Sequence, residues 1–553
     1  MPGDVAIHHL GGGLGLGRNP FGRDVANLAL YRALARHGGF DTLHMLTALD
    51  TRVEDVTASL SEGAPLRTRV EVSSLLDLDR ARRAGVLFRG KPDLSEMAWS
   101  RREAGPDEAY SLVGLIHTLA PPTTREEIAA ASLAPTQPWD AIICTSPAVQ
   151  AAMRNLFEGW TGYLADRFGG GARPIPQLPL LPLGVDAAVL RGQADRPDVR
   201  AAARGRLGLA EDDVLVLWVG RLSFYEKATP QPMFQAVEAA GAASGRRMAF
   251  ALAGWFPQEA HKTLFEEAAQ TYAPTTAVHW IDGNDAVALG EMWAAADIFL
   301  SLVDNIQETF GLAPVEAMAA GLPVVASDWD GYRYTIEHGV QGFLAPTMTP
   351  SPGPPSLGIA RRHLNRMDTY QSYVGQLAQF TAVDVGAASR GLAALAGSRE
   401  LRKAMGEAGR ARVAAHFDWP VVARAYAALF EDLARARPRG GEVRAPRTHP
   451  VHGDPFADFA GFATARLDVG TRLSVAEGVD PATHPALAGG ARLDDFASAR
   501  RLPAAQLRPV VEDIARRGAP TVLELLTPCP VASRAQLTYS LAWLCKMGVL
   551  SWS

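Results

Sequence analysis

Short apolar runs alternate with segments of helical character along most of the chain, and this alternation occurs twice. Such a pattern is typical of a parallel sheet whose strands are joined by crossover helices. The first series lies at 5–10, 43–46, 112–117 and 141–144. The pattern restarts at 183–186, and the second series lies at 214–219, 248–253, 278–281, 298–302 and 323–326. The sequence therefore predicts an α/β protein with two doubly wound, Rossmann-like domains that face a cleft, with ligands at the carboxyl ends of the strands.

The chain length agrees with more than one domain. A single hydrophobic core stops growing near about 250 to 300 residues, and this chain has 553. A helix expected near 421–433 should pack on a domain through one apolar face. After it comes a stretch rich in Pro, Gly and Arg, which reads as a linker. The predicted boundaries are 1–186 for the first domain, 187–435 for the second, 436–460 for the linker and 461–553 for a small, mainly helical domain.

The last of these segments is expected to contain helices at 521–526 and 533–547 and a short strand at 548–550. This order is similar to a winged-helix module. From Gly461 onward, ten Arg and Lys residues face eight acidic ones, so the basic surface is thin. The composition favours a protein contact or a homo-oligomer role over nucleic acid binding.

Bulk composition gives no sign of a membrane protein or a disulfide-stabilised one. The net charge of -5 provides no general attraction to nucleic acid or to an anionic membrane. Three cysteines without metal-type spacing favour a reduced compartment. The start of the chain lacks a basic region followed by an apolar one, and no run approaches the ~20 residues that cross a bilayer. We therefore expect a cytoplasmic protein without a transmembrane segment.

The stretch ETFGLAPVEAMAAGLPVVASDWDG, residues 308–331, carries the main chemical signal. Pro314 suits the first position of a helix and Gly321 suits the residue just after its end, so 314–320 should be a short helix. The loop 309–312 would then present unpaired N–H groups at the positive end of this helix, which is a natural cradle for phosphate.

Two acidic residues flank this predicted cradle. Glu316 on the helix and Glu308 before the turn can each accept hydrogen bonds from hydroxyls. A nucleoside diphosphate sugar has the matching layout, with hydroxyls on both sides of two phosphates. The alternative is that Glu316 caps its own helix and that Glu308 is a solvated loop residue.

Two cations follow another predicted strand. Arg221 and Lys227 come just after the strand 214–219, where they could neutralise a departing diphosphate. A solvated basic pair is the alternative. Lysine is scarce in this chain, with only five examples, so its occurrence in such a segment is informative: Lys91, Lys227, Lys262, Lys403 and Lys546.

Together these segments resemble glycosyltransferase family 4, a retaining family with the GT-B fold that uses activated sugars. The resemblance covers roughly residues 1–435 and is stronger in the second half. It rests on Gly220, Arg221, Leu222 and Lys227, on Glu308 and Glu316, and on the segments 183–186, 321–325 and 405–410.

The resemblance implies a role for each matching residue. Arg221 and Lys227 would hold the donor diphosphate, Glu308 the hydroxyls of the donor sugar, and Glu316 the ribose. His117, at the end of a predicted strand, would line the sugar as the active-site histidine, although such a residue is otherwise often packed or on the surface. The catalytic residues implied are thus His117, Arg221, Lys227 and Glu308. The other donor-binding residues implied are Gly12 and Gly13 under the phosphates and sugar, Gly254 and Ile281 (with 282–283) beside the nucleobase, and the backbone of Phe310, Gly311 and Leu312.

The sequence also departs from the family pattern. Ala228 replaces the glycine that often follows the donor lysine, and residues 332–334 replace the usual acidic residue after the strand. The loop 11–22 is unusually rich in glycine, yet no strict G-x-G-x-x-G fits it, which argues against a nicotinamide oxidoreductase. The D-x-D strings at 77–79 and 328–330 are interpreted as chance, and no metal or other cofactor is implied.

The function expected is transfer of a sugar from a nucleoside diphosphate sugar to an acceptor hydroxyl, with retention of configuration. Two alternatives stay open. One is another GT-B enzyme, a phosphorylase or an epimerase, and the other is a non-catalytic regulator that binds sugar nucleotides. A hydrolase has no support, because no nucleophile-elbow motif lies in a strand-turn-helix context.

Overall fold

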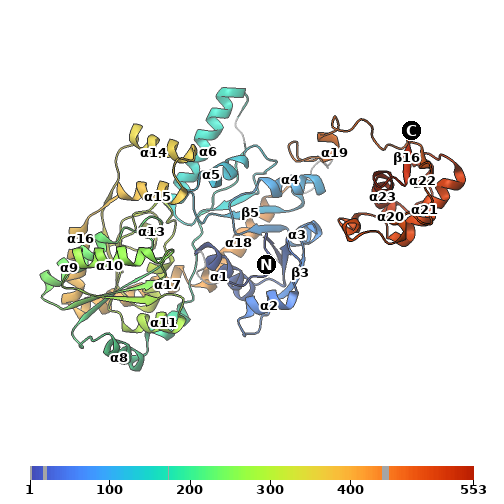
Figure 1. Ribbon diagram of the computed structural model, residues 1–553. Helices are drawn as coiled ribbons and strands as arrows, with labels where there is room; N and C mark the ends of the chain where they lie inside the picture. The colour runs from blue at the N-terminus through green and yellow to red at the C-terminus, as the bar shows by residue number, and fades with distance from the viewer. Residues whose placement is uncertain (1–2, 17–21, 172–173, 439–446) are drawn as a thin grey trace. The chain divides into compact units, whose positions relative to one another are not determined.

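The computed structural model describes residues 3–16, 22–171, 174–438 and 447–553 (Figure 1). The chain divides into two compact units, residues 1–449 and 450–553. Each unit is described by itself. The predicted boundaries at 186, 435 and 460 remain predictions, and much of the predicted linker lies outside the described residues.

The first unit contains two six-stranded sheets, and every strand in each sheet pairs in parallel with its neighbours. The first sheet has the order β3-β2-β1-β4-β5-β6. Its strands are β1 (Asp4–His9), β2 (Thr42–Thr47), β3 (Arg69–Ser74), β4 (Val86–Arg89), β5 (Ser111–Leu115) and β6 (Ala141–Ile143). The associated helices are α1 (Gly22–His37), α2 (Val53–Ser61), α3 (Leu78–Ala84), α4 (Ser95–Ala104), α5 (Pro122–Ala130) and α6 (Pro147–Phe168).

The second sheet repeats this topology, with the order β12-β11-β10-β7-β8-β9. Its strands are β7 (Val214–Val219), β8 (Met248–Gly254), β9 (Ala277–Asp282), β10 (Ile298–Ser301), β11 (Val324–Ser327) and β12 (Gly342–Ala345). The helices of this part are α7 (Ala187–Ala194), α8 (Pro197–Arg206), α9 (Gln231–Ser244), α10 (Ala260–Tyr272), α11 (Ala286–Ala295), α12 (Leu312–Ala320), α13 (Tyr332–Thr335), α14 (Pro354–Leu364), α15 (Tyr370–Gln379), α16 (Val385–Gly397) and α17 (Arg399–His416). A small antiparallel pair, β13 (Thr347–Met348) and β14 (Ala382–Val383), lies beyond β12.

Both sheets have the doubly wound order in which the third, second and first strands are followed by the fourth, fifth and sixth. In such sheets a ligand binds where the order reverses, beyond the carboxyl ends of the central strands. These points lie between β1 and β4 and between β7 and β10. The prediction of two Rossmann-like domains is confirmed, and the loops after β1, β7 and β10 are the ones that the topology directs to a ligand.

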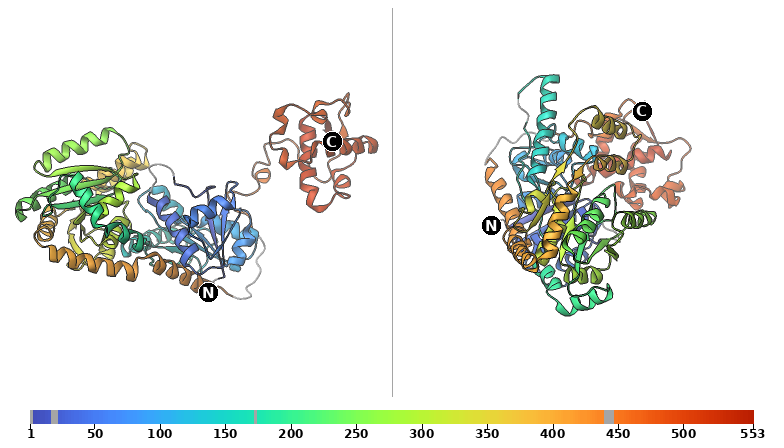
Figure 2. Two further views of the ribbon diagram at one scale, coloured as in Figure 1. Left: turned by 90° about the horizontal axis from the view of Figure 1, so that it is seen from below. Right: turned by 90° about the vertical axis from the view of Figure 1, so that its left-hand side faces the viewer.

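The chain crosses between the two domains twice. At the first crossing, Val185 hydrogen-bonds to the segment that forms the second crossing. The Val185 N–H donates to the Phe417 carbonyl at 2.8 Å, and the Val185 carbonyl accepts from the Trp419 N–H at 3.1 Å. Helix α18 (Trp419–Ala436) then packs against α1 (Figure 2). The Tyr426 and Phe430 rings of α18 lie near that of Phe88. The helix expected near 421–433 therefore does pack on a domain, and the domain is the first one.

The second unit is mainly helical. Its helices are α19 (Pro455–Asp458), α20 (Pro485–Ala488), α21 (Ala504–Arg517), α22 (Val522–Leu526) and α23 (Arg534–Lys546), and its strands are β15 (Leu473–Val475) and β16 (Leu550–Trp552). The two predicted helices and the final strand are present. Strand β16 pairs antiparallel with β15, which precedes the helices in the chain. Throughout the described parts of the chain, no helix has the length and apolar character needed to cross a membrane.

Candidate active site

The loop before α12 forms the centre of the site. Helix α12 begins at Leu312, two residues before the predicted start at Pro314, and Gly311 precedes it with a φ of 88°. An added Cβ at Gly311 would overlap the ring of Tyr332, so both the left-handed conformation and the available space require glycine. Gly321 ends the helix with a φ of 89°, as predicted. The amino end of α12 thus faces the loop 308–311 with its first N–H groups.

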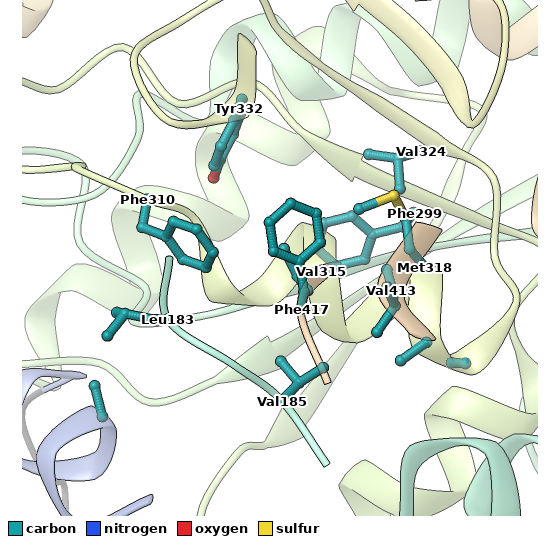
Figure 3. Packing of buried hydrophobic residues seen from close by; sticks show 14 of the residues in the cluster. Leu183, Val185, Phe299, Phe310, Val315, Met318, Val324, Tyr332, Val413 and Phe417 are labelled. Carbon is teal, nitrogen blue, oxygen red and sulfur yellow. The ribbon is translucent and has the colours of Figure 1, made fainter. Parts of the chain in front are cut away.

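The aromatic side chain in this loop belongs to the core. Phe310 is 2% exposed, and its ring meets that of Phe417 edge to face at a centroid distance of 5.9 Å. Figure 3 shows Phe310 and Phe417 among apolar side chains from both crossings and from α12. This packing leaves the backbone of residue 310 as the part that can contact a ligand. The N–H groups of Thr309 and Phe310, which the sequence predicted to be unpaired, donate to the carboxylate of Glu308.

Lys227 and Glu308 form an ion pair beside this helix end. The Lys227 Nζ lies 2.6 Å from the Glu308 carboxylate, although the two residues are 81 positions apart in sequence. Burial raises the pKa of Glu308, but the Lys227 charge and hydrogen bonds from Lys227, Thr309 and Phe310 outweigh this effect and hold the pKa below its usual value. Glu308 is therefore ionised at neutral pH. The alternative of a solvated loop residue is wrong.

Glu316 behaves differently from Glu308. Burial raises its pKa to about 7, and the only opposing influence is the charge of Lys227. Among the described residues, none donates a hydrogen bond to its carboxylate, and no side chain caps α12. The alternative that Glu316 caps its own helix is therefore wrong. A half-buried carboxylate without a donor is suited to accept hydroxyls from a ligand.

Arg221 lies after β7 on the same side of the sheet. One of its guanidinium nitrogens is 2.8 Å from the carboxylate of Glu226, and the guanidinium lies 6.0 Å from the ring centre of Trp255. Sequence reasoning missed both partners, because no motif marked them. Arg221 and Lys227 each have an acidic partner, so a diphosphate would compete with Glu226 and Glu308 for them.

The carboxyl ends of β7, β8 and β9, beside these cations, pack backbone to backbone. A Cβ at Gly254 would overlap the carbonyl of Gly220, and the Gly283 N–H donates to the Gly254 carbonyl at 2.9 Å. Close approach of the strands is thus sufficient to explain Gly254. Ile281, near the end of β9, is half-buried against the core. The roles of Gly254 and Ile281 beside a nucleobase stay predictions.

The first domain reaches the same loop from the opposite side. The carbonyl oxygen of His117 accepts a hydrogen bond from the Thr309 hydroxyl at 2.9 Å, and the Thr145 hydroxyl donates to the Thr309 carbonyl at 3.3 Å. His117 Nε2 is 2.8 Å from the side-chain oxygen of Asn27, and burial lowers the pKa of this histidine to about 3, so the ring is neutral. Sequence reasoning named His117 and the loop that contains Thr309 but missed Asn27 and Thr145.

The two glycines after β1 differ in their surroundings. A Cβ at Gly12 would lie 3.0 Å from the Thr51 hydroxyl oxygen, whereas one at Gly13 would meet no atom within 4 Å. Gly13 therefore borders open space. The later part of the glycine-rich loop, residues 17–21, lies outside the described residues.

A cavity of about 440 Å³ lies next to the loop and reaches Thr309. Its other walls come from α5, α6, the segment 328–330 and α15, so it is formed by both domains. None of the predicted donor-binding residues lines it. In the described part of the chain, no cluster of three or more His, Cys, Asp or Glu side chains could hold a metal ion.

Two facing Rossmann-like sheets, with a helix end and two cations in the loops between them, define the GT-B class. Residues 199–351, which include β7 to β12, match the family of glycosyl transferases group 1.

Individual proteins are also similar to parts of this chain. A D-inositol 3-phosphate glycosyltransferase of Geodermatophilus obscurus is 31% identical over 206 residues, which are 34% of this chain and 40% of the relative. One from Acidothermus cellulolyticus is 29% identical over 238 residues, which are 42% of this chain and 51% of the relative. The chain thus spans about half or less of the length of these curated relatives.

The fold is also that of solved structures. Anabaena Alr3699/HepE, solved in complex with UDP and glucose, is similar with a TM-score of 0.50 and 15% identity, over 78% of this chain and 100% of that one. This likeness concerns the fold alone.

Proposed function

We propose that the protein is a retaining glycosyltransferase that moves a sugar from a nucleoside diphosphate sugar to an acceptor hydroxyl. One observation carries the proposal: the ammonium group of Lys227 lies 2.6 Å from Glu308 at the amino end of α12, the helix that also bears Glu316. A cation, the amino end of a helix and two carboxylates in this order match the charges and hydroxyls of such a donor.

The reaction depends on stabilising the leaving group. As the bond between the sugar and the diphosphate breaks, negative charge grows on the diphosphate. Arg221, Lys227 and the amino end of α12 oppose this charge from fixed positions, and such preorganised groups supply the largest share of many rate enhancements. Retention requires the acceptor hydroxyl to enter on the face from which the diphosphate leaves. No carboxylate needs to act as a nucleophile.

The remaining donor contacts follow the same layout. Glu308 would accept hydroxyls of the sugar and Glu316 those of the ribose, while the backbone of residues 310–312 would bind phosphate or sugar. Gly254 and Ile281 would lie beside the base. Gly12, Gly13 and His117 would border the sugar from the first domain, since the His117 carbonyl already contacts Thr309.

For the second unit we propose a winged-helix-like module that makes a protein contact or supports a homo-oligomer. The succession of α22, α23 and β16 supports this form. We further propose that the protein acts in the cytoplasm, in keeping with its three unpaired cysteines.

A nucleotide screen tests the proposed function. We expect at least one nucleoside diphosphate, and its sugar, to raise the melting temperature of the full chain, because binding to the folded state alone stabilises it. An assay for slow hydrolysis of that sugar nucleotide then separates an enzyme from a non-catalytic binder. Inositol phosphate is the first acceptor to assay, given the names of the relatives. If no nucleotide shifted the melting temperature, the proposal would be wrong.

Replacement of Glu316 by glutamine should weaken nucleotide binding about 10- to 100-fold, because a hydrogen bond to a charged group contributes about 1.5–3 kcal/mol. The wild-type affinity should also rise with pH through about 7, since binding of hydroxyls favours the ionised form of a carboxyl whose pKa is raised to about 7. Calorimetry at pH 6 and pH 8 measures both effects. An E316Q variant that keeps wild-type affinity and pH dependence would remove Glu316 from the donor site.

A further inference from the structure

The cavity beside the donor loop has a composition of its own. It is bounded by α5 and α6 of the first domain and by the segment 328–330, α13 and α15 of the second, and Thr309 joins it to the loop of the donor site. Much of its wall is apolar: Leu119, Ala120, Val149, Leu156, Ile306 and the rings of Trp329 and Tyr373. The Trp329 N–H already donates to the Asn305 carbonyl at 3.0 Å, which fixes the indole in the wall.

Asp330 stands out among the polar residues of this wall. Its φ of 37° is in the left-handed region, which non-glycine residues adopt at a cost of about 1–3 kcal/mol. Such strain persists where the surrounding structure holds it, often at ligand sites. Burial raises the pKa of its carboxyl to about 7, and one oxygen accepts a hydrogen bond from the Ser146 hydroxyl at 2.7 Å. Within the described chain, its second oxygen receives no hydrogen bond.

Ser146 ties this aspartate to the first domain. Its hydroxyl also accepts from Val149 N at 3.1 Å and so caps the amino end of α6. The single proton of the Ser146 hydroxyl is thus committed to Asp330, while its oxygen accepts from Val149. The hydrogen bond from Ser146 thus fixes Asp330 against the first domain. Asp330 lines the cavity together with Trp329 and Thr309, and its second carboxylate oxygen can accept a hydrogen bond from a ligand.

The cavity is lined by both basic and acidic side chains, so it does not strongly prefer a positively or a negatively charged ligand. Arg333 is 3.1 Å from Asp328, and Arg125 is an exposed cation of α5. Pockets that combine apolar and aromatic walls with a few fixed polar groups bind molecules that have an apolar face and directed hydrogen-bonding groups. A ring with hydroxyls on its edge has both features.

We propose that this cavity is the acceptor subsite, that it takes a carbohydrate-type polyol, and that Asp330 accepts a hydrogen bond from the hydroxyl that is glycosylated. This inference rests on the proposed function. In the transfer, the bond from the sugar C1 to the diphosphate oxygen breaks and a bond from C1 to the acceptor oxygen forms. The diphosphate leaves with the electron pair, and the hydroxyl proton ends on it. Asp330 orients the acceptor during this exchange.

Two variants test the subsite separately from the donor site. Ala152→Trp places an indole in the cavity from α6. Ala151→Trp is the matched control, because Ala151 is an equally exposed alanine of the same helix that does not line the cavity. Asp330→Asn keeps the size of the side chain, and asparagine tolerates a positive φ well. The probes are p-nitrophenyl β-D-glucoside as acceptor and the sugar nucleotide that gives the largest thermal shift as donor.

We expect A152W and D330N to lower transfer to the p-nitrophenyl glucoside at least tenfold, as measured by mass spectrometry. The affinity for the nucleoside diphosphate should stay within about twofold of wild type in both, and A151W should match wild type in both measurements. Equal transfer by A152W and A151W, unchanged transfer by D330N, or no transfer to the probe by a wild-type protein that hydrolyses its donor would overturn the inference. A wild-type protein that neither binds nor hydrolyses a sugar nucleotide would overturn the proposed function instead, and the inference with it.

Discussion

The Lys227→Ala variant is expected to lose turnover by about 100- to 1,000-fold, the usual effect of removing one preorganised group that stabilises developing charge. Lys227 is the ammonium group at the amino end of α12, 2.6 Å from Glu308. Its removal takes away a charge that opposes the departing diphosphate, and it leaves the carboxylate of Glu308 without its cation. Both effects raise the barrier to transfer.

Steady-state release of the nucleoside diphosphate measures this loss. Lys403→Ala is the matched control, because Lys403 is exposed on α17 and its ion pair with the exposed Glu407 is long, at 3.9 Å. The control should retain wild-type turnover. The melting temperature of both variants shows whether they are folded. Near-normal turnover in a folded K227A protein would remove the central residue of the proposed site.

The largest effect on stability is expected at Asp140, in the first domain. Its carboxylate pairs with the guanidinium of Arg101 at 2.7 and 2.8 Å and also accepts the backbone N–H groups of Leu112 and Gln137, and both side chains of the ion pair are 0% exposed. Removing one partner of a buried pair costs about 3–5 kcal/mol, because the other charge stays buried without compensation. Asp140→Ala should therefore lower the free energy of unfolding of the first unit by this amount.

Denaturant unfolding of the full chain, followed by tryptophan fluorescence, checks the value. Asp79→Ala is the control: Asp79 also pairs with an arginine, Arg82 at 2.7 Å, but its side chain is 75% exposed. Exposed pairs contribute about 0–1 kcal/mol, so this variant should unfold almost like wild type. Equal losses of unfolding free energy in the two variants would show that burial of the ion pair does not set its contribution to stability.

The alternation of apolar runs was enough to predict both sheets, because a strand buried on both faces must be apolar along its whole length. Three strands were missed. The edge strand β3 carries Arg69, Glu71 and serines, and only part of it is buried, so its sequence lacks the apolar run. β4 (VLFR) ends in an arginine and β12 (GFLA) begins with a glycine, so each has only three apolar residues in a row.

The proximity of the residues in the proposed donor site was predictable for a related reason. Glu308, Gly311 and Glu316 are fixed near one another by a turn and one helix, so their spacing in sequence is nearly their spacing in space. Arg221 and Lys227 were found in the same way, from a strand end. Their acidic partners were not predicted, because whether a carboxylate reaches a cation depends on side-chain positions.

The sequence by itself determined the two sheets, the glycine turn before α12 and the identity of the residues around it, because each depends on neighbours within a few positions. Only the tertiary structure decided which distant groups meet: Lys227 with Glu308, Thr309 with His117, and Asp330 with Ser146, which are separated by 81, 192 and 184 positions. The 328–330 string, interpreted as chance, proved to line an interdomain cavity. Such contacts depend on how two domains pack, and no local pattern encodes that packing.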